Sequence, residues 1–243
     1  MCQLSRLINS LIFLMIAITL LTSCAIQPTF VVTKYPVNLE VAIRTLINDL
    51  LQQLRNDQGI LGGLKQTKMV LDPFVDAHSG EVVKVSRQME QIIFDEIHNH
   101  FNNIVIDRMT SQNIRESQYV INGVINLEDY EVSDSNPLDK YYHVSSSVIS
   151  LNTAKIIANS NTWVSERELD YTPTASYQDS PMYLKDKRFD SQVHTAKSAL
   201  GKSIQPEEYY NSLDTNALLV EANTVYEKPD YEQALRLFDT AAS

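Results

Sequence analysis

The chain has 243 residues, 44% of them hydrophobic, and is therefore long enough to bury a core of its own. Its 20 Lys and Arg stand against 30 Asp and Glu, which gives a formal net charge of −10. A surface of this sign repels nucleic acid and anionic lipid headgroups, so we expect no nucleic-acid partner. Tyrosine is used 12 times and tryptophan once. Many tyrosines suit either protein interfaces or the rims of a sheet.

The first 23 residues differ in composition from everything that follows. Arg6 is their one charge, and the apolar run 7–21 is too short to span a bilayer as a helix, which needs roughly 20 residues. This is the pattern of a signal peptide. The sequence Leu21-Thr22-Ser23-Cys24 resembles the lipobox of bacterial lipoproteins. The alternative is a chance cysteine at the end of an N-terminal anchor helix.

The resemblance to lipoproteins implies that Cys24 carries the lipid, palmitate included, and becomes the new N-terminus. Cys2 is discarded, so no disulfide is possible in the mature chain. In such lipoproteins Asp after the cysteine implies inner-membrane retention; Ala25 therefore implies the periplasmic face of the outer membrane. Residues 24–36 form the lipidated end and a tether, whose 12 residues after the cysteine reach at most ~43 Å at ~3.6 Å per residue.

The central part of the chain alternates helical and strand patterns, which predicts an α/β (α+β) fold with a mixed sheet covered by helices. Apolar residues recur at steps of three and four in two stretches, and short β-branched or alternating runs mark the strands. In chain order we expect helix 38–55 with Asn38 as its N-cap, strand 67–76 interrupted at Pro73, helix 85–101, strand 104–107, a short helix over 112–116 capped by Thr110 or Ser111, strand 119–127, and a hairpin of 142–151 with 155–164.

Three short segments carry a further resemblance: 69–74 (Met-Val-Leu-Asp-Pro-Phe), 104–108 (Ile-Val-Ile-Asp-Arg) and 119–123 (Tyr-Val-Ile-Asn-Gly). In this order they resemble the periplasmic α/β domain of penicillin-binding-protein activators of the LpoB kind, FlgO-type lipoproteins and the curli secretion lipoprotein CsgG. The resemblance implies such a domain over 37–170. It does not extend to a pore, because no pair of segments alternates over two membrane-length strands.

After Tyr171 the pattern weakens, and 171–205 is expected to be an extended loop or arm. A helical pattern returns over 206–243, where the spacing of Ala234 and Phe238 resembles the core of a tetratricopeptide hairpin. One such unit cannot bury its apolar face alone, so it must dock on the α/β domain or on another chain. The residues expected to bind a partner are Tyr226, Tyr231, Leu235 and Phe238.

The motifs of common enzymes are missing from the sequence. It has no Gly-x-Ser-x-Gly, no Gly-rich phosphate loop and no cysteine left free after lipidation. His98 and His100 would lie about 200° apart on a helix, so they cannot share one metal ion. The acidic stretches 128–131 and 166–170 are typical of solvated sheet and loop ends. We therefore expect a non-enzymatic protein with no metal and no cofactor beyond the lipid on Cys24.

These expectations point to a protein that acts through its surfaces. The first hypothesis is a periplasmic structural subunit of a cell-envelope complex, such as the outer-membrane core of a secretion system. The alternative is an activator of a peptidoglycan synthase, as the LpoB resemblance implies. The short tether favours the first, because those activators place their domain on a long arm. Expected partners are the outer membrane, other envelope proteins and a second copy of the chain.

Overall fold

The computed structural model describes residues 35–59, 65–130, 139–179, 193–202 and 206–242, with the side chains of 206–212 left out. The leader, Cys24 and nearly all of the tether lie outside these ranges, and so do 60–64, 131–138, 180–192, 203–205 and 243. Among the described residues, no helix combines the length and the hydropathy that a membrane span requires.

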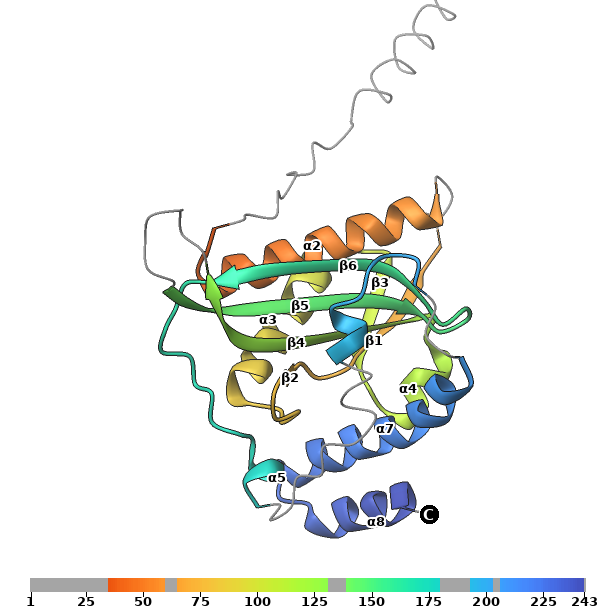
Figure 1. The fold of residues 1–243 in the computed structure, drawn as a ribbon. Helices are drawn as coiled ribbons and strands as arrows, with labels where there is room; N and C mark the ends of the chain where they lie inside the picture. The colour runs from red at the N-terminus through yellow and green to blue at the C-terminus, as the bar shows by residue number, and fades with distance from the viewer. Residues whose placement is uncertain (1–34, 60–64, 131–138, 180–192, 203–205, 243) are drawn as a thin grey trace, which may run out of the picture. The chain divides into compact units, whose positions relative to one another are not determined.

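A six-stranded mixed sheet organises the described chain (Figure 1). The strands run in the order β3-β1-β4-β5-β6, and β2 pairs separately with β4. The pairs β1–β3, β1–β4 and β2–β4 are parallel, while β4–β5 and β5–β6 are antiparallel. The strands are β1 Thr67–Leu71, β2 Val75–Asp76, β3 Ile104–Arg108, β4 Tyr119–Tyr130, β5 Asp139–Ser150 and β6 Lys155–Val164. The expected fold class is confirmed.

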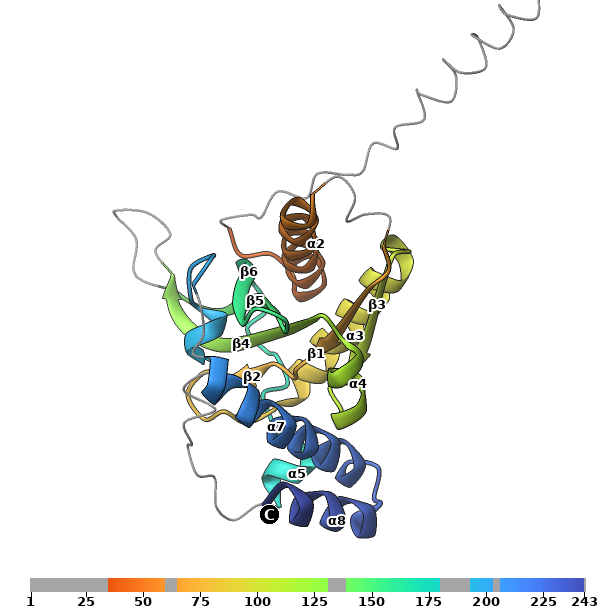
Figure 2. The ribbon, with the colours of Figure 1, turned by 90° about the vertical axis from the view of Figure 1, so that its right-hand side faces the viewer.

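Two long helices cover one face of the sheet (Figure 2). Helix α2, Leu39–Gln58, begins at Asn38, whose side chain accepts a hydrogen bond from the backbone N–H of Val41, and ends at Gly59 with a φ of 69°. Helix α3, Lys84–His100, follows the turn after β2. Their apolar stripes and the facing residues of the strands form the main core, in which Phe74 is fully buried. Burial of this continuous apolar surface stabilises the fold.

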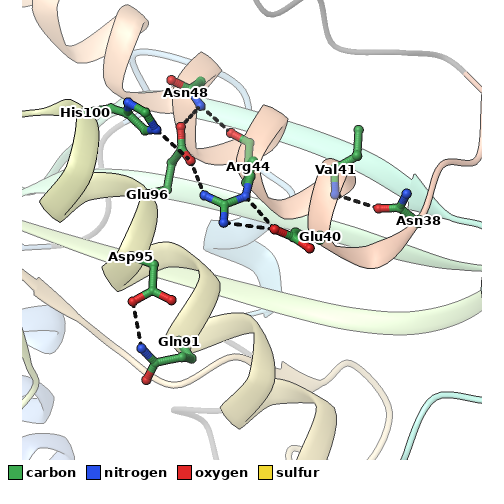
Figure 3. A network of polar contacts seen from close by, with 9 residues as sticks. All are labelled: Asn38, Glu40, Val41, Arg44, Asn48, Gln91, Asp95, Glu96 and His100. Carbon is green, nitrogen blue, oxygen red and sulfur yellow. Dashed lines mark hydrogen bonds and ion pairs between the residues drawn. The ribbon is translucent and has the colours of Figure 1, made fainter.

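A polar network joins the two helices above that core (Figure 3). Glu96 of α3 is buried, yet both of its carboxylate oxygens have partners on α2. Arg44 Nη1 lies 2.5 Å from Oε2, and Asn48 Nδ2 donates to Oε1 at 2.7 Å. Arg44 also pairs with the exposed Glu40 at 3.0 Å. A buried carboxylate is tolerated only when it is paired in this way, so the network fixes how α2 and α3 sit against each other.

The opposite face of the sheet is covered by the C-terminal part of the chain. Helix α4, Ser111–Glu116, begins at its N-cap Thr110, and helix α7, Pro206–Tyr226, packs against it and the sheet. Ala217 of α7 lies in a second core cluster with Val70 of β1. The stripe of Ile92, Ile93 and Ile97 on α3 was expected to pack on the sheet that carries Val70 and Ile106, and it does, with Ile106 packed against the same core. Because successive strand residues alternate faces, Met69 and Leu71 of β1 point toward α3, whereas Val70 points toward α7.

The stretch expected as an extended arm, 171–205, is described in part and is not free of the fold. It contains a short helix, α5 Ala175–Gln178, and its described end, 193–202, lies on the sheet. Tyr177, Val193 and Ala196 pack with Val124 of β4 in a third cluster. Residues 180–192 lie outside the described chain. The described ends of this arm therefore help to cover the second face of the sheet.

Candidate interaction surface

A helical hairpin forms the C-terminal end of the described chain. Helix α7 is followed by α8, Tyr231–Ala242, which packs along it on the side away from the sheet (Figure 2). Small side chains are fully buried in the hairpin, Ala217 and Ala222 on α7 and Ala234 on α8. Two packed helices with alanines at these spacings agree with the expected hairpin, whose assignment as a tetratricopeptide unit stays a prediction.

The four residues expected to bind a partner lie together at this hairpin. Tyr226 ends α7, and its ring packs edge-on against Tyr231 with 4.9 Å between centroids. The Tyr226 hydroxyl donates to Asp179 Oδ2 at 2.8 Å, so this side chain is already hydrogen-bonded within the protein. Tyr231 is 58% exposed and Leu235 is 60% exposed, while Phe238 is half-buried. Of the four residues, Tyr231 and Leu235 of α8 are therefore the two that are most exposed to a partner.

The other side of the hairpin is docked on the α/β domain. Leu213, Ala217 and Val220 of α7 pack with Met109 and Ile114, which lie just before and within α4. In contrast, α8 packs chiefly on α7. The apolar face of the hairpin is thus divided: the domain covers α7, and α8 stands outside it.

Charged side chains fasten the far end of α7. Arg87 of α3 lies with Nη2 2.9 Å from Glu227 Oε1, and with Nη1 2.7 Å from Glu90 Oε1. Glu90 is almost completely buried; burial raises the pKa of its carboxyl, and the cation of Arg87 opposes that rise. Arg108 Nε lies 3.7 Å from the other oxygen of Glu90. This cluster connects the hairpin to α3 and β3.

Asp72, at the end of β1, meets α7 in a more apolar setting. It is 7% exposed, and Asn216 Nδ2 lies 3.4 Å from its Oδ2. Burial raises the pKa of the Asp72 carboxyl to about 7, against the weaker effect of the Asn216 contact. Below about pH 7 the folded protein therefore favours the neutral form of Asp72, whereas in the unfolded chain this carboxyl has its ordinary pKa near 4.

Replacing Asp72 by asparagine should stabilise the protein increasingly as pH rises. Between about pH 4 and pH 7 the folded state binds a proton that the unfolded state releases, so the wild type loses stability across this range and stays lower above it. The difference in the free energy of unfolding between Asp72→Asn and wild type should grow to at most about 4 kcal/mol, at roughly 1.4 kcal/mol per pKa unit. Urea unfolding of both proteins at pH 4, 5.5, 7 and 8 measures it. A constant difference would contradict the account.

The acidic stretches have structural partners. Glu128 accepts from Asn126 Nδ2 at 2.5 Å and lies 3.0 Å from Lys197 Nζ and 2.7 Å from His143 Nδ1. Although partial burial works in the other direction, these partners lower the pKa of Glu128 to about 2. Glu166 Oε1 accepts from the backbone N–H of Leu39 and so caps the start of α2. A carboxyl held ionised, as that of Glu128 is, is unsuited to donate a proton as a general acid.

Possible metal ligands are scattered over the described residues. No group of three His, Cys, Asp or Glu side chains in the ranges given above is arranged to hold a metal ion. His98 and His100 are both exposed on the last turn of α3, and His100 Nε2 lies 3.8 Å from Glu96 Oε2.

These features define an α+β protein with a docked C-terminal hairpin. No family model matches the sequence, and no curated protein does. Among solved structures the chain is similar to the LpoB C-terminal domain from Salmonella enterica, with a TM-score of 0.35 and 12% sequence identity. The match covers 51% of this chain and 96% of that one. At this TM-score the likeness is remote.

Sequence reasoning missed the polar contacts that fasten α7. Arg87 and Glu227 are 140 positions apart, and Asp72 and Asn216 are 144 apart. No local pattern connects residues so distant. The one available signal was Asp72 directly before Pro73, an acidic residue within an otherwise apolar run.

Proposed function

We propose that the chain is a non-enzymatic lipoprotein of the bacterial envelope that works by binding another envelope protein through α8. The observation that supports it best is the exposure of Tyr231 and Leu235 on a helix whose own packing is with α7. The lipobox-like sequence ending at Cys24 supports an anchored protein with its folded part outside the cytoplasm.

The exposed apolar groups on α8 are concentrated. Six large apolar side chains are exposed in the described chain, and two of them, Tyr231 and Leu235, lie one helical turn apart. Charged residues surround the pair, including Glu232 and Arg236, which form an ion pair at 2.7 Å, and Asp239. An apolar centre with a polar rim is the usual composition of a protein interface.

Two kinds of partner remain within this proposal. A subunit of a secretion-system outer-membrane core would bind other subunits permanently, whereas an activator would bind a peptidoglycan synthase. The resemblance of the sequence to LpoB-type activators supports the second kind of partner, whereas the short tether supports the first. Identification of the protein captured through α8 would distinguish a secretion-system subunit from a peptidoglycan synthase.

Leu235→Asp should release the partner while the domain stays folded, because a carboxylate in the centre of the apolar patch must be desolvated on binding. Leu127→Asp is the matched control, since Leu127 is 46% exposed and lies on β4, in a different element. The full chain is purified from cells with its partners, and the melting temperature of each variant is then measured after the partners have been removed. We expect at least a tenfold loss of co-purifying protein for Leu235→Asp alone, with unchanged melting.

Two results would contradict the proposal. Equal capture by Leu235→Asp and wild type would show that α8 is not the interface. A fall in melting temperature with the partner retained would show that Leu235 serves the fold instead.

Anchoring is tested independently by Cys24→Ser. Because the anchor is proposed to be the lipid and not the polypeptide, the variant should leave the membrane fraction and melt as the wild type does. Cell fractionation and labelling with radioactive palmitate measure both. Label retained by the variant, or a variant that sediments with membranes when its partner is removed by Leu235→Asp, would contradict lipidation at this cysteine.

A further inference from the structure

The main run of strands in the described sheet ends at β6 on one side and at β3 on the other, and the two ends differ in how the chain covers them. Other segments occupy the outer edge of β6 at three points. At the first point, Gly201 N donates to Ile156 O and Ile156 N donates to Lys202 O. At the second, the side-chain amide of Gln53 hydrogen-bonds to the backbone C=O and N–H of Asn159, at 2.8 and 3.1 Å. At the third, Val37 N donates to Trp163 O, and Val37 O accepts from Ser165 N. Edges covered in this way cannot accept another strand.

The direction of each backbone group on β3 follows from its pairing with β1. Thr67 N donates to Asn103 O, and Met109 N donates to Leu71 O. In a parallel ladder alternate residues of one strand bond to the same neighbour, so residues 103, 105, 107 and 109 turn their backbone groups toward β1. The backbone groups of Ile104, Ile106 and Arg108 consequently point outward, away from the sheet.

Two of these outward groups are already used. Ile104 N donates to Phe101 O at 2.9 Å, and Arg108 O accepts from Asn113 Nδ2 at 2.9 Å. Within the described ranges the C=O of Ile104, both groups of Ile106 and the N–H of Arg108 have no protein partner. Backbone groups on a bare edge are a template for a further strand.

The free groups on β3 are complementary to themselves. In an antiparallel pair of two β3 strands centred on Ile106, the two Ile106 residues exchange N–H and C=O bonds. Arg108 N–H of each strand then faces the Ile104 C=O of the other, and these are the groups that remain free. The Ile104 N–H and Arg108 C=O, which this register would leave over, are the two that already have partners.

The side chains leave this edge accessible. Ile106 is half-buried against the main core, and Val105 is half-buried on the other face. A charged side chain beside a strand edge can block pairing, but the guanidinium of Arg108 lies over the Phe94 ring, 5.4 Å from its centroid, and near Glu90. We propose that β3 pairs antiparallel with β3 of a second copy about Ile106, which joins two sheets into one.

Cysteine cross-linking in cells tests the register of the full chain. In the proposed pair Ile106 faces itself with Cα atoms about 5.5 Å apart, and Val105 faces Asp107 of the second copy at about 4.5 Å. Both separations suit a disulfide. Ile106→Cys should therefore give a disulfide-linked dimer by itself. Val105→Cys and Asp107→Cys should give one only when the two variants are co-expressed.

The controls are the parent chain, which accounts for Cys2 and Cys24, and Leu127→Cys, an exposed position on another strand. We expect at least tenfold more dimer for the two predicted combinations than for any control. Dimer from Val105→Cys alone, or equal dimer from Leu127→Cys, would overturn the proposed register, and so would no dimer at Ile106.

Proline substitution gives a second, non-covalent readout. Ile106→Pro removes an N–H that points outward and leaves the ladder with β1 intact. Asn161→Pro is the matched control, because Asn161 shares the outward direction of Asn159 on the opposite edge and its N–H has no partner among the described residues. Ile106→Pro should abolish concentration-dependent association in sedimentation, and Asn161→Pro should retain it. Association of Ile106→Pro as strong as that of wild type would refute pairing through β3.

Discussion

Gly123→Ala should destabilise the protein by about 3 kcal/mol or more, because the methyl group has no room in the sheet. A Cβ atom at Gly123 would lie 2.1 Å from Phe74 Cε1, and two further ring atoms lie within 2.5 Å. Phe74 is fully buried in the main core and cannot move aside without opening a cavity. Urea unfolding of the chain from residue 25 onward measures the change.

A double variant separates this clash from a general loss of strand propensity. In Phe74→Leu the smaller side chain costs stability by itself, but it leaves space for a methyl group at Gly123. The two substitutions together should therefore cost less than the sum of the single ones. Additive losses would show that the approach of Phe74 to Gly123 is not the reason for glycine there.

Ile93→Ala should cost about 2–5 kcal/mol, since it removes most of a side chain that is 1% exposed in the main core. Ile92→Ala is the matched control on the same helix, because Ile92 is only half-buried, and it should cost clearly less. Both losses are read from chemical denaturation. A loss below about 0.5 kcal/mol for Ile93→Ala would mean that α3 does not cover the sheet in this orientation.

Much of the α/β core could be predicted because its signals are local. Asn38 caps α2 through the backbone N–H of the third residue after it, Thr110 caps α4 in the same way, and Pro73 separates β1 from β2. Each depends on residues within a few positions. The ends of β4 and β5 extended beyond the prediction, to Tyr130 and from Asp139, because polar residues on a half-exposed strand give no apolar pattern.

What depends on contacts distant in sequence could not be predicted. Alternation along β1 shows that Val70 and Met69 face opposite sides, but not which side α3 covers. The sequence correctly required that the C-terminal hairpin dock somewhere. It could not assign α7 to the domain and α8 to the surface, because that division is made by Met109, Ile114 and the Arg87–Glu227 pair.

Site-specific photocross-linking in living cells tests directly whether α8 is the surface through which this protein binds another envelope protein. A photoreactive amino acid replaces Leu235 in one strain and Leu127 in another, two exposed apolar positions on different elements. We expect a discrete cross-linked product at Leu235, containing another envelope protein, and none at Leu127. The absence of a product at Leu235, or the same product at both positions, would contradict it.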